Sequence, residues 1–253
     1  MQALQVVLIG SGNVATHLGE ALSQAGAQIT FVYDRKIERA KILARKFKAK
    51  AISDVTKIKN QPSLIIIAIK DDAIPGVVKK MHVQEGIVVH TSGSVPMEVL
   101  KKFAQYGVLY PLQTFSEGRK IDFSTVPVCI EASDTSTLLS LTTISETISD
   151  YVYNLDSSQR LVTHVAAVFA NNFTNHLYTL AENLLKKQKL PFDLLQPLIL
   201  ETAGKVSELS PVEAQTGPAV RGDETAIKKH LEVLRKDKKL HSIYSLLSKS
   251  LKK

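Results

Sequence analysis

The chain has 253 residues, of which 44% are hydrophobic and 22% are charged. These are the fractions of an ordinary globular protein, so they exclude a disordered polymer and a membrane bundle, and the length suggests two domains. The longest apolar runs, such as 64–69, are far shorter than the roughly 20 residues that span a bilayer. The N-terminus carries no basic segment ahead of an apolar stretch, and Cys129 is the single cysteine. We therefore expect no secretory signal, no disulfide, no metal cluster and a cytoplasmic protein.

The first half of the chain alternates short β-rich runs with helical patterns, which is typical of a parallel sheet flanked by helices. Strands are expected over 4–9, 28–33, 49–52, 63–69, 86–90, 107–109, 126–131 and 151–154. Helices are expected over 13–25, 37–46, 96–105 and 135–149. Several of the strands are apolar throughout, as strands covered on both faces are.

After residue 155 the β patterns stop, and a long helix is expected over 158–188. Its first turns, 161–170, are apolar almost all round, which predicts a helix buried on every side. Turn signals at 190–191, 210–211 and 216–218 divide the rest into further helices. The predicted fold is α/β: a Rossmann-type doubly wound sheet over 1–155, followed by an all-α domain over 156–253.

The formal net charge of +8 is concentrated at the C-terminus. Nine basic and two acidic residues between Lys228 and Lys253 give this segment a net charge of +7. Apolar residues recur in it at helical spacing, so two amphipathic helices with solvated lysines are expected. Binding of RNA or an anionic membrane is the less favoured alternative, because the segment has one aromatic residue and no recognised nucleic-acid motif.

A glycine turn follows the first expected strand and opens the first expected helix. Its sequence, Gly10-Ser11-Gly12-Asn13-Val14-Ala15, matches the dinucleotide-binding fingerprint G-x-G-x-x-G/A. Gly10 permits the tight turn, Gly12 lets a backbone N–H approach the pyrophosphate, and Ala15 allows the helix to pack closely on the strand. We therefore expect a bound dinucleotide here; the alternative is a chance glycine turn.

The end of the second expected strand bears on the choice of cofactor. Asp34, 24 residues after Gly10, can accept hydrogen bonds from a ribose 2′-hydroxyl, which favours NAD. Arg35 and Lys36 can bind a 2′-phosphate, which favours NADP, and Arg35 can also stack on adenine. Alternatively, this is an exposed helix start with Asp34 as its N-cap. The choice stays open, with a slight preference for NADP.

Motifs in both halves of the chain resemble known families. The glycine turn, residues 66–74 and Val89-His90-Thr91-Ser92-Gly93-Ser94 resemble the N-terminal domain shared by pyrroline-5-carboxylate reductases and deazaflavin-dependent NADP reductases. Residues 110–115, the helix with His164, and Thr216-Gly217-Pro218-Ala219-Val220-Arg221-Gly222-Asp223 resemble a bacterial two-domain family of provisionally assigned oxidoreductases. The resemblance implies a helical C-terminal domain like that of 6-phosphogluconate dehydrogenase, and a homodimer formed through it.

Ligands of Rossmann enzymes lie outside the carboxyl ends of the strands, so the residues that follow each strand are candidates. The resemblance places the loops after the fourth and fifth strands beside the nicotinamide and the substrate. Ser92-Gly93 can alternatively be an ordinary turn. The candidate cofactor-binding residues are Gly10, Ser11, Gly12, Asn13, Val14, Asp34, Arg35, Lys36, Ala68, Ile69, Lys70, Thr91 and Ser92.

The candidate catalytic residues lie in the second half. His164 is a polar residue in an apolar helix, so it needs a partner or a ligand, and it can share one helix face with Asn171 or Asn172. In 6-phosphogluconate and hydroxyisobutyrate dehydrogenases a Lys and an Asn one turn apart on this helix act in proton transfer and substrate binding. This chain departs from that pattern, because it has His164 and no lysine in the turn. A histidine can act as a general acid or base, and the alternative is a purely structural histidine.

Arg221 can clamp a substrate carboxylate or phosphate, and Asp223 can cap the helix that begins near Glu224. Alternatively, Arg221 and Asp223 form an ion pair that fixes their loop. The sequence thus predicts an NAD(P)-dependent oxidoreductase that transfers a hydride between nicotinamide and a small carbonyl, imine or hydroxy substrate held in a cleft between the two domains. His164 would handle the proton, Asn171 or Asn172 would orient the substrate, and Arg221 would bind an anionic group. The alternative is a dinucleotide-binding sensor or scaffold without catalysis.

Overall fold

The computed structural model describes residues 3–58 and 62–251, so Lys252 and Lys253 of the basic segment lie outside the described residues. Contacts divide the chain into two compact units, Met1–Asn171 and Asn172–Lys253. The change from strands to helices falls near residue 155, as expected. The boundary between the two units lies further along the chain, at residues 171 and 172, because the first turns of the helix that follows the sheet belong to the first unit.

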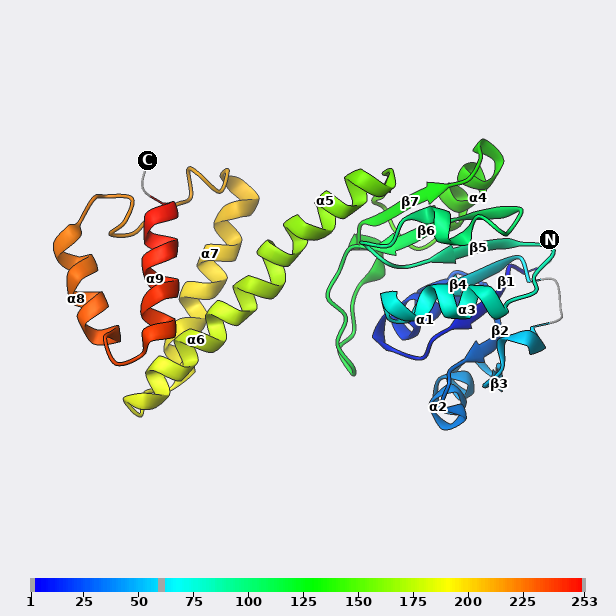
Figure 1. Ribbon diagram of the computed structural model, residues 1–253, viewed down its shortest axis with the longest axis horizontal. Helices are drawn as coiled ribbons and strands as arrows, with labels where there is room; N and C mark the ends of the chain where they lie inside the picture. The colour runs from blue at the N-terminus through cyan, green and yellow to red at the C-terminus, as the bar shows by residue number, and fades with distance from the viewer. Residues whose placement is uncertain (1–2, 59–61, 252–253) are drawn as a thin grey trace. The chain divides into compact units, whose positions relative to one another are not determined.

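The first unit is built on an eight-stranded sheet in the order β3-β2-β1-β4-β5-β6-β7-β8 (Figure 1). The strands are β1 Gln5–Ile9, β2 Gln28–Tyr33, β3 Lys50–Ile52, β4 Leu64–Ile67, β5 Ile87–His90, β6 Gln105–Pro111, β7 Val128–Ala132 and β8 Val152–Asn154. All pairs from β3 to β6 are parallel, and β7 runs antiparallel to β6. The strand order changes direction between β1 and β4, which is where this class of sheet binds ligands. The predicted Rossmann-type fold is confirmed.

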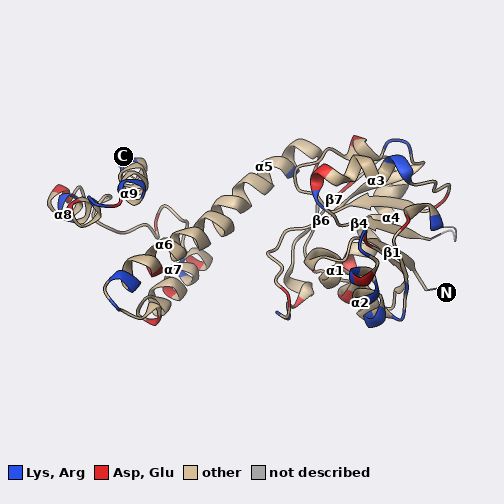
Figure 2. Ribbon diagram, turned by 60° about the horizontal axis from the view of Figure 1, so that its bottom comes forward, with Lys and Arg blue, Asp and Glu red and all other residues tan. Residues whose placement is uncertain are grey.

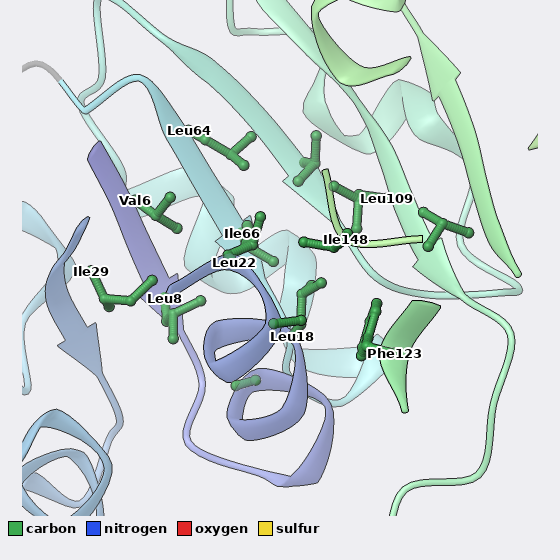
Figure 3. Packing of buried hydrophobic residues seen from close by; sticks show 14 of the residues in the cluster. Val6, Leu8, Leu18, Leu22, Ile29, Leu64, Ile66, Leu109, Phe123 and Ile148 are labelled. Carbon is green, nitrogen blue, oxygen red and sulfur yellow. The ribbon is translucent and has the colours of Figure 1, made fainter. Parts of the chain in front are cut away.

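Helices cover both faces of the sheet. They are α1 Asn13–Gln24, α2 Ile37–Phe47, α3 Ile74–Lys80 and α4 Thr135–Glu146. Alternate strand residues point to opposite faces, so Leu8 packs with α1 and α2 whereas its neighbour Ile9 packs with α3. Figure 3 shows the first cluster, in which Leu18 and Leu22 of α1 lie among the buried strand residues. Burial on both faces explains why these strands are apolar throughout.

Two local predictions are wrong. The helix expected over 96–105 is a short 3-10 turn, Met97–Leu100, and β6 already begins at Gln105. Leu100 and Phe103 are both buried against the α3 face, so this short segment is anchored to the core instead of continuing as a helix. In addition, α3 was not predicted, because Pro75 and Gly76 in its first turn hide the helical pattern.

The helices after the sheet are α5 Ser157–Ala167, α6 Thr174–Lys187, α7 Gln196–Glu208, α8 Glu224–Leu234 and α9 Lys238–Ser250. A π-helical segment, Val168–Phe173, joins α5 to α6 without a break, so the expected long helix is present. The expectation that its first turns are buried on every side is wrong, since Val162 is 66% exposed. Its burial is limited to the side that carries Arg160, which is 1% exposed and faces the sheet.

The C-terminal basic helices are amphipathic, as expected. Ile227 and Leu234 of α8 are buried, and the lysines of α8 and α9 lie on solvated faces, coloured blue in Figure 2. Lys187 at the end of α6 pairs with Asp237, the N-cap of α9, at a distance of 3.2 Å. This ion pair links α6 to α9. In the described ranges no helix is both long enough and apolar enough to cross a membrane.

Candidate functional site

The glycine turn connects β1 to α1 at the carboxyl edge of the sheet. Gly10 has a φ of +123°, and a Cβ added there would lie 2.1 Å from the Ala68 carbonyl oxygen, so the fold itself requires glycine. At Gly12 an added Cβ would meet nothing within 4 Å. No side chain in the described part of the chain caps the N-terminus of α1. The turn therefore presents an open glycine and uncapped N–H groups, which is how a helix N-terminus receives a phosphate.

Asp34 follows β2 and is bonded to the same turn. The Ser11 hydroxyl donates to Oδ2 of Asp34 at 2.6 Å, and the backbone N–H of Lys36 donates to Oδ1 at 2.9 Å. The N-cap of α2 is Lys36, so the reading of Asp34 as the N-cap is wrong. Both carboxylate oxygens have partners within the protein, whereas the side chains of Arg35 and Lys36 are exposed. Two exposed cations thus lie beside one carboxylate at this end of β2, so the local net charge is positive.

The loop after β6 lies along α1. Nδ2 of Asn13 donates to the Phe115 carbonyl at 2.9 Å, and the His17 ring stacks on Phe115 with centroids 5.0 Å apart. A cavity of about 690 Å³ is bounded by α1, α2 and residues 117–123, and Ser11 and Gly12 contribute to its lining. Val14, in the first turn of α1, is half-buried. The first turn of α1 is therefore held in place while the backbone at Gly12 stays accessible.

The loops after β4 and β5 are adjacent. Ser94 donates its hydroxyl proton to Asp71 at 2.5 Å and so links the two loops. Ser92 is buried, and its hydroxyl oxygen accepts hydrogen bonds from the N–H groups of Ser94 and Val95 at 3.1 and 3.0 Å, which is the arrangement of an ordinary turn. Ala68, Ile69 and Thr91 are half-buried, and Lys70 is exposed.

His164, a residue of α5, lies beside these loops. Its Nδ1 lies 3.0 Å from the hydroxyl of Tyr110, which is close to the carboxyl end of β6. The imidazole also lies against Gly93, where an added Cβ would stand 2.7 Å from Cγ and Nδ1. Burial raises the pKa of Tyr110 to about 12, so its hydroxyl stays protonated at neutral pH. A histidine and a neutral phenol thus meet at the edge of the sheet that carries the glycine turn.

The candidate residues chosen from the sequence did not include Tyr110. The available signal was its position near the end of a strand, in the motif over 110–115, together with the need of His164 for a polar partner. The structure supplies that partner within the first unit.

A buried ion pair fixes the start of α5. Nη1 of Arg160 pairs with Glu131 of β7, and Nη2 donates to the Val95 carbonyl at 2.7 Å. The N–H of Ser157 donates to Glu131 at 2.9 Å. Arg160 precedes His164 by one helical turn, so these contacts hold the helix that presents the imidazole. The sequence analysis missed this pair, because the spacing of two residues on different elements does not reveal it.

The other candidate catalytic residues, Asn171, Asn172 and Arg221, are all exposed. Asn171 and Asn172 are exposed in the π-helical segment, and Asn172 begins the second unit. Arg221 is exposed and forms no ion pair within the described residues, so the expected alternative of a pair with Asp223 is not found. Asp223 caps α8, as expected, by accepting from the N–H of Ala226 at 2.9 Å. The grouping of Asn171, Asn172 and Arg221 with His164 stays a prediction.

Comparisons with known proteins agree with this two-part architecture. A model described as a Rossmann-like domain matches residues 1–115, and a model described as a domain of unknown function (DUF2520) matches residues 126–251. A search of curated proteins finds no match.

Solved structures extend the comparison over the whole chain. A provisionally assigned NADP oxidoreductase from Bacteroides fragilis is 46% identical, with 98% of each chain covered and a TM-score of 0.91. Protein TM1727 from Thermotoga maritima is 23% identical, with 97% of this chain and 96% of that chain covered and a TM-score of 0.76. An imine reductase from Myxococcus stipitatus in complex with NADP+ is 14% identical, with 98% and 92% covered and a TM-score of 0.69. The last two similarities concern the fold alone.

The identity of 46% over nearly the entire length, together with the two matching domain models, shows the family. The chain belongs to the two-domain proteins that join a Rossmann-like N-terminal domain to a C-terminal DUF2520 domain.

Proposed function

We propose that this protein is an NADP-dependent oxidoreductase that transfers a hydride between nicotinamide and a small carbonyl, imine or hydroxy substrate. The observation that carries the proposal is the shared location of two features. The open turn at Gly12 follows β1, and Tyr110, the partner of His164, lies near the carboxyl end of β6, a strand parallel to β1 in the same sheet. A phosphate-binding turn and a group that can exchange a proton are the two requirements of nicotinamide-dependent reduction.

The residues of the glycine turn fit a dinucleotide. Gly12 and the first N–H groups of α1 would bind the pyrophosphate, and the loops after β4 and β5 would border the nicotinamide. When bound, NADPH supplies the hydride. His164 would exchange the proton, Asn171 or Asn172 would orient the substrate, and Arg221 would bind an anionic group on it.

NADP is favoured over NAD because of the hydrogen bonds around Asp34. Its two oxygens already accept from Ser11 and from the backbone of Lys36. A 2′-phosphate can instead pair with the exposed cations Arg35 and Lys36. The 46% identical relative from Bacteroides fragilis is named as an NADP oxidoreductase, which agrees with this preference.

The proposal is tested by following NADPH absorbance with a panel of cyclic imines, keto esters and keto acids. We expect at least one of them to be reduced, and we expect His164→Ala to lower turnover by about 10²- to 10⁴-fold, the usual contribution of a general acid. His176→Ala is the matched control, since His176 is an exposed histidine of α6. Full turnover of His164→Ala with the true substrate would remove His164 from the mechanism.

We further propose a homodimer formed through the helical unit. Helices α6, α7 and α9 contain no buried residue within the described part of the chain. Leu198 and Leu200 of α7 are 63% and 72% exposed. Helices that leave large apolar side chains such as these exposed are typical of a face that another subunit covers. Light scattering should give twice the chain mass, and Leu198→Asp should reduce it toward that of the monomer; a monomeric wild-type protein at micromolar concentration would contradict this.

A further inference from the structure

The contact between His164 and Tyr110 involves one specific nitrogen of the imidazole ring. The imidazole has two nitrogens, and the Tyr110 hydroxyl lies 3.0 Å from Nδ1. Among the described residues, the hydrogen bond found for this ring is the one at Nδ1. The Gly93 backbone lies against Cγ and Nδ1 of the same ring. The Nδ1 side of the imidazole is therefore enclosed by protein, and Nε2 is the nitrogen left for a ligand.

We propose that Tyr110 is a positioning residue whose hydroxyl occupies Nδ1 of His164 and thereby assigns proton exchange with the substrate to Nε2. This inference rests on the proposed function, because it concerns the proton that accompanies hydride transfer. A hydroxyl suits the task because it accepts a hydrogen bond from a protonated Nδ1 and donates one to a bare Nδ1. It can hold the ring in either protonation state, as the partner of a catalytic histidine must.

The proton balance of the step follows from this arrangement. In the reductive direction the substrate carbon accepts the hydride, and the π electron pair of its C=O or C=N bond moves to the heteroatom. The Nε2–H bond of protonated His164 breaks, and the proton bonds to that heteroatom. The imidazole is left neutral, with its remaining proton on Nδ1 and donated to the Tyr110 oxygen. Oxidation of an alcohol or amine runs through the same transfers in reverse.

Gly93 also helps to position the His164 ring. A Cβ at this position would come within 2.7 Å of the ring, closer than real Cβ atoms come to other heavy atoms, so the imidazole would have to move. Glycine in the loop after β5 thus provides the space in which His164 reaches Tyr110. Because the φ of Gly93 is not positive, backbone conformation alone does not require a glycine here. The close approach of the His164 ring gives a steric reason for it.

The direct test uses nitrogen NMR on the full chain labelled at its histidines, with NADP+ present. His164→Gln identifies the signals of His164 among the seven histidines. We expect Tyr110→Phe to shift the Nδ1 resonance of His164. Tyr106→Phe is the matched control, because Tyr106 lies in the same strand and is also half-buried. Unchanged His164 signals in Tyr110→Phe would overturn the inference.

Gly93→Ala provides an independent perturbation. The added methyl should displace the ring and shift the same resonances, whereas Gly76→Ala should not, because a Cβ at Gly76 meets nothing within 4 Å. Identical spectra for Gly93→Ala and the wild type would show that the ring is not held against this glycine.

Turnover separates positioning from direct contact with the substrate. With the substrate found in the reductase panel, Tyr110→Phe should lower kcat by about 10²-fold, the cost of a misplaced catalytic group, and leave KM unchanged. Adding Tyr110→Phe to His164→Ala should cost nothing further, because Tyr110 acts through His164. A further loss in the double variant would assign Tyr110 a direct catalytic role and overturn the inference. Failure of the wild type to bind NADPH would instead remove the proposed function, while the NMR result would still decide the histidine's partner.

Discussion

The buried ion pair of Arg160 and Glu131 gives the sharpest prediction for stability. Arg160 is 1% exposed, and its guanidinium bonds to Glu131 and to the Val95 carbonyl. Among the described residues, Arg160→Met would leave the buried Glu131 carboxylate with the N–H and hydroxyl of Ser157 as its donors. Removing one partner of such a pair costs about 3 to 5 kcal/mol of unfolding free energy. The two remaining donors place the expected loss near the lower end of that range, at about 3 kcal/mol.

Urea denaturation followed by tyrosine fluorescence measures this loss. The chain has no tryptophan, and five of its seven tyrosines lie in the first unit. Arg160→Met combined with Glu131→Gln should recover most of the loss, because no unpaired charge remains buried. Arg235→Met is the control, since Arg235 and Glu232 are both about two-thirds exposed and such pairs contribute less than about 1 kcal/mol. A loss below about 1 kcal/mol for Arg160→Met would refute the reasoning.

Four further predictions concern the cofactor site and the sheet. Gly12→Ala should keep the free energy of unfolding within about 1 kcal/mol, since its backbone is in the extended region, and yet weaken NADPH binding at least about tenfold. Gly10→Ala, at a φ of +123°, should lower stability by about 2 kcal/mol or more, as thermal denaturation will show. Arg35→Ser with Lys36→Ser should weaken NADPH binding by about 10- to 100-fold and leave NADH binding unchanged in calorimetry. Burial lowers the pKa of His90 from 6.5 to about 4, so unfolding takes up a proton between these values. Stability should be complete above about pH 6.5 and should fall by up to about 3 kcal/mol as the pH drops to 4, and His90→Phe should remove that dependence in denaturation curves.

The sheet was predictable because its strands are buried on both faces. Runs such as Leu64–Ile67 are apolar without alternation, which is typical of a strand between two layers of helices. The turn at residues 10–15 was predictable for a related reason, since its fingerprint is local in sequence. The two failures have opposite causes. Over 74–80 a helix forms although Pro75 and Gly76 hide the helical pattern, and over 96–105 the burial of Leu100 and Phe103 outweighs local helical propensity.

The candidate site was only partly predictable. Residues that follow strands could be picked from the sequence, and His164 stood out as a polar residue in an apolar helix. Tyr110 and Gly93 could not be assigned to His164, because they lie 54 and 71 positions away along the chain and meet it only through the order of the strands. The opposite error was made for Val162, whose apolar character was taken as burial within the chain. Contacts of this kind depend on the topology of the fold, which hydrophobic periodicity does not report.

Calorimetric titration of the purified protein with NADPH, NADP+, NADH and NAD+ tests the central claim most directly, with Gly12→Asp as the matched variant. The account predicts micromolar binding, tighter for NADPH than for NADH, that is lost in Gly12→Asp while the circular dichroism spectrum and the melting temperature stay close to those of the wild type. The open environment of Gly12 supports that expectation for the fold. Absence of binding to all four nucleotides by the folded wild-type protein would contradict the oxidoreductase account.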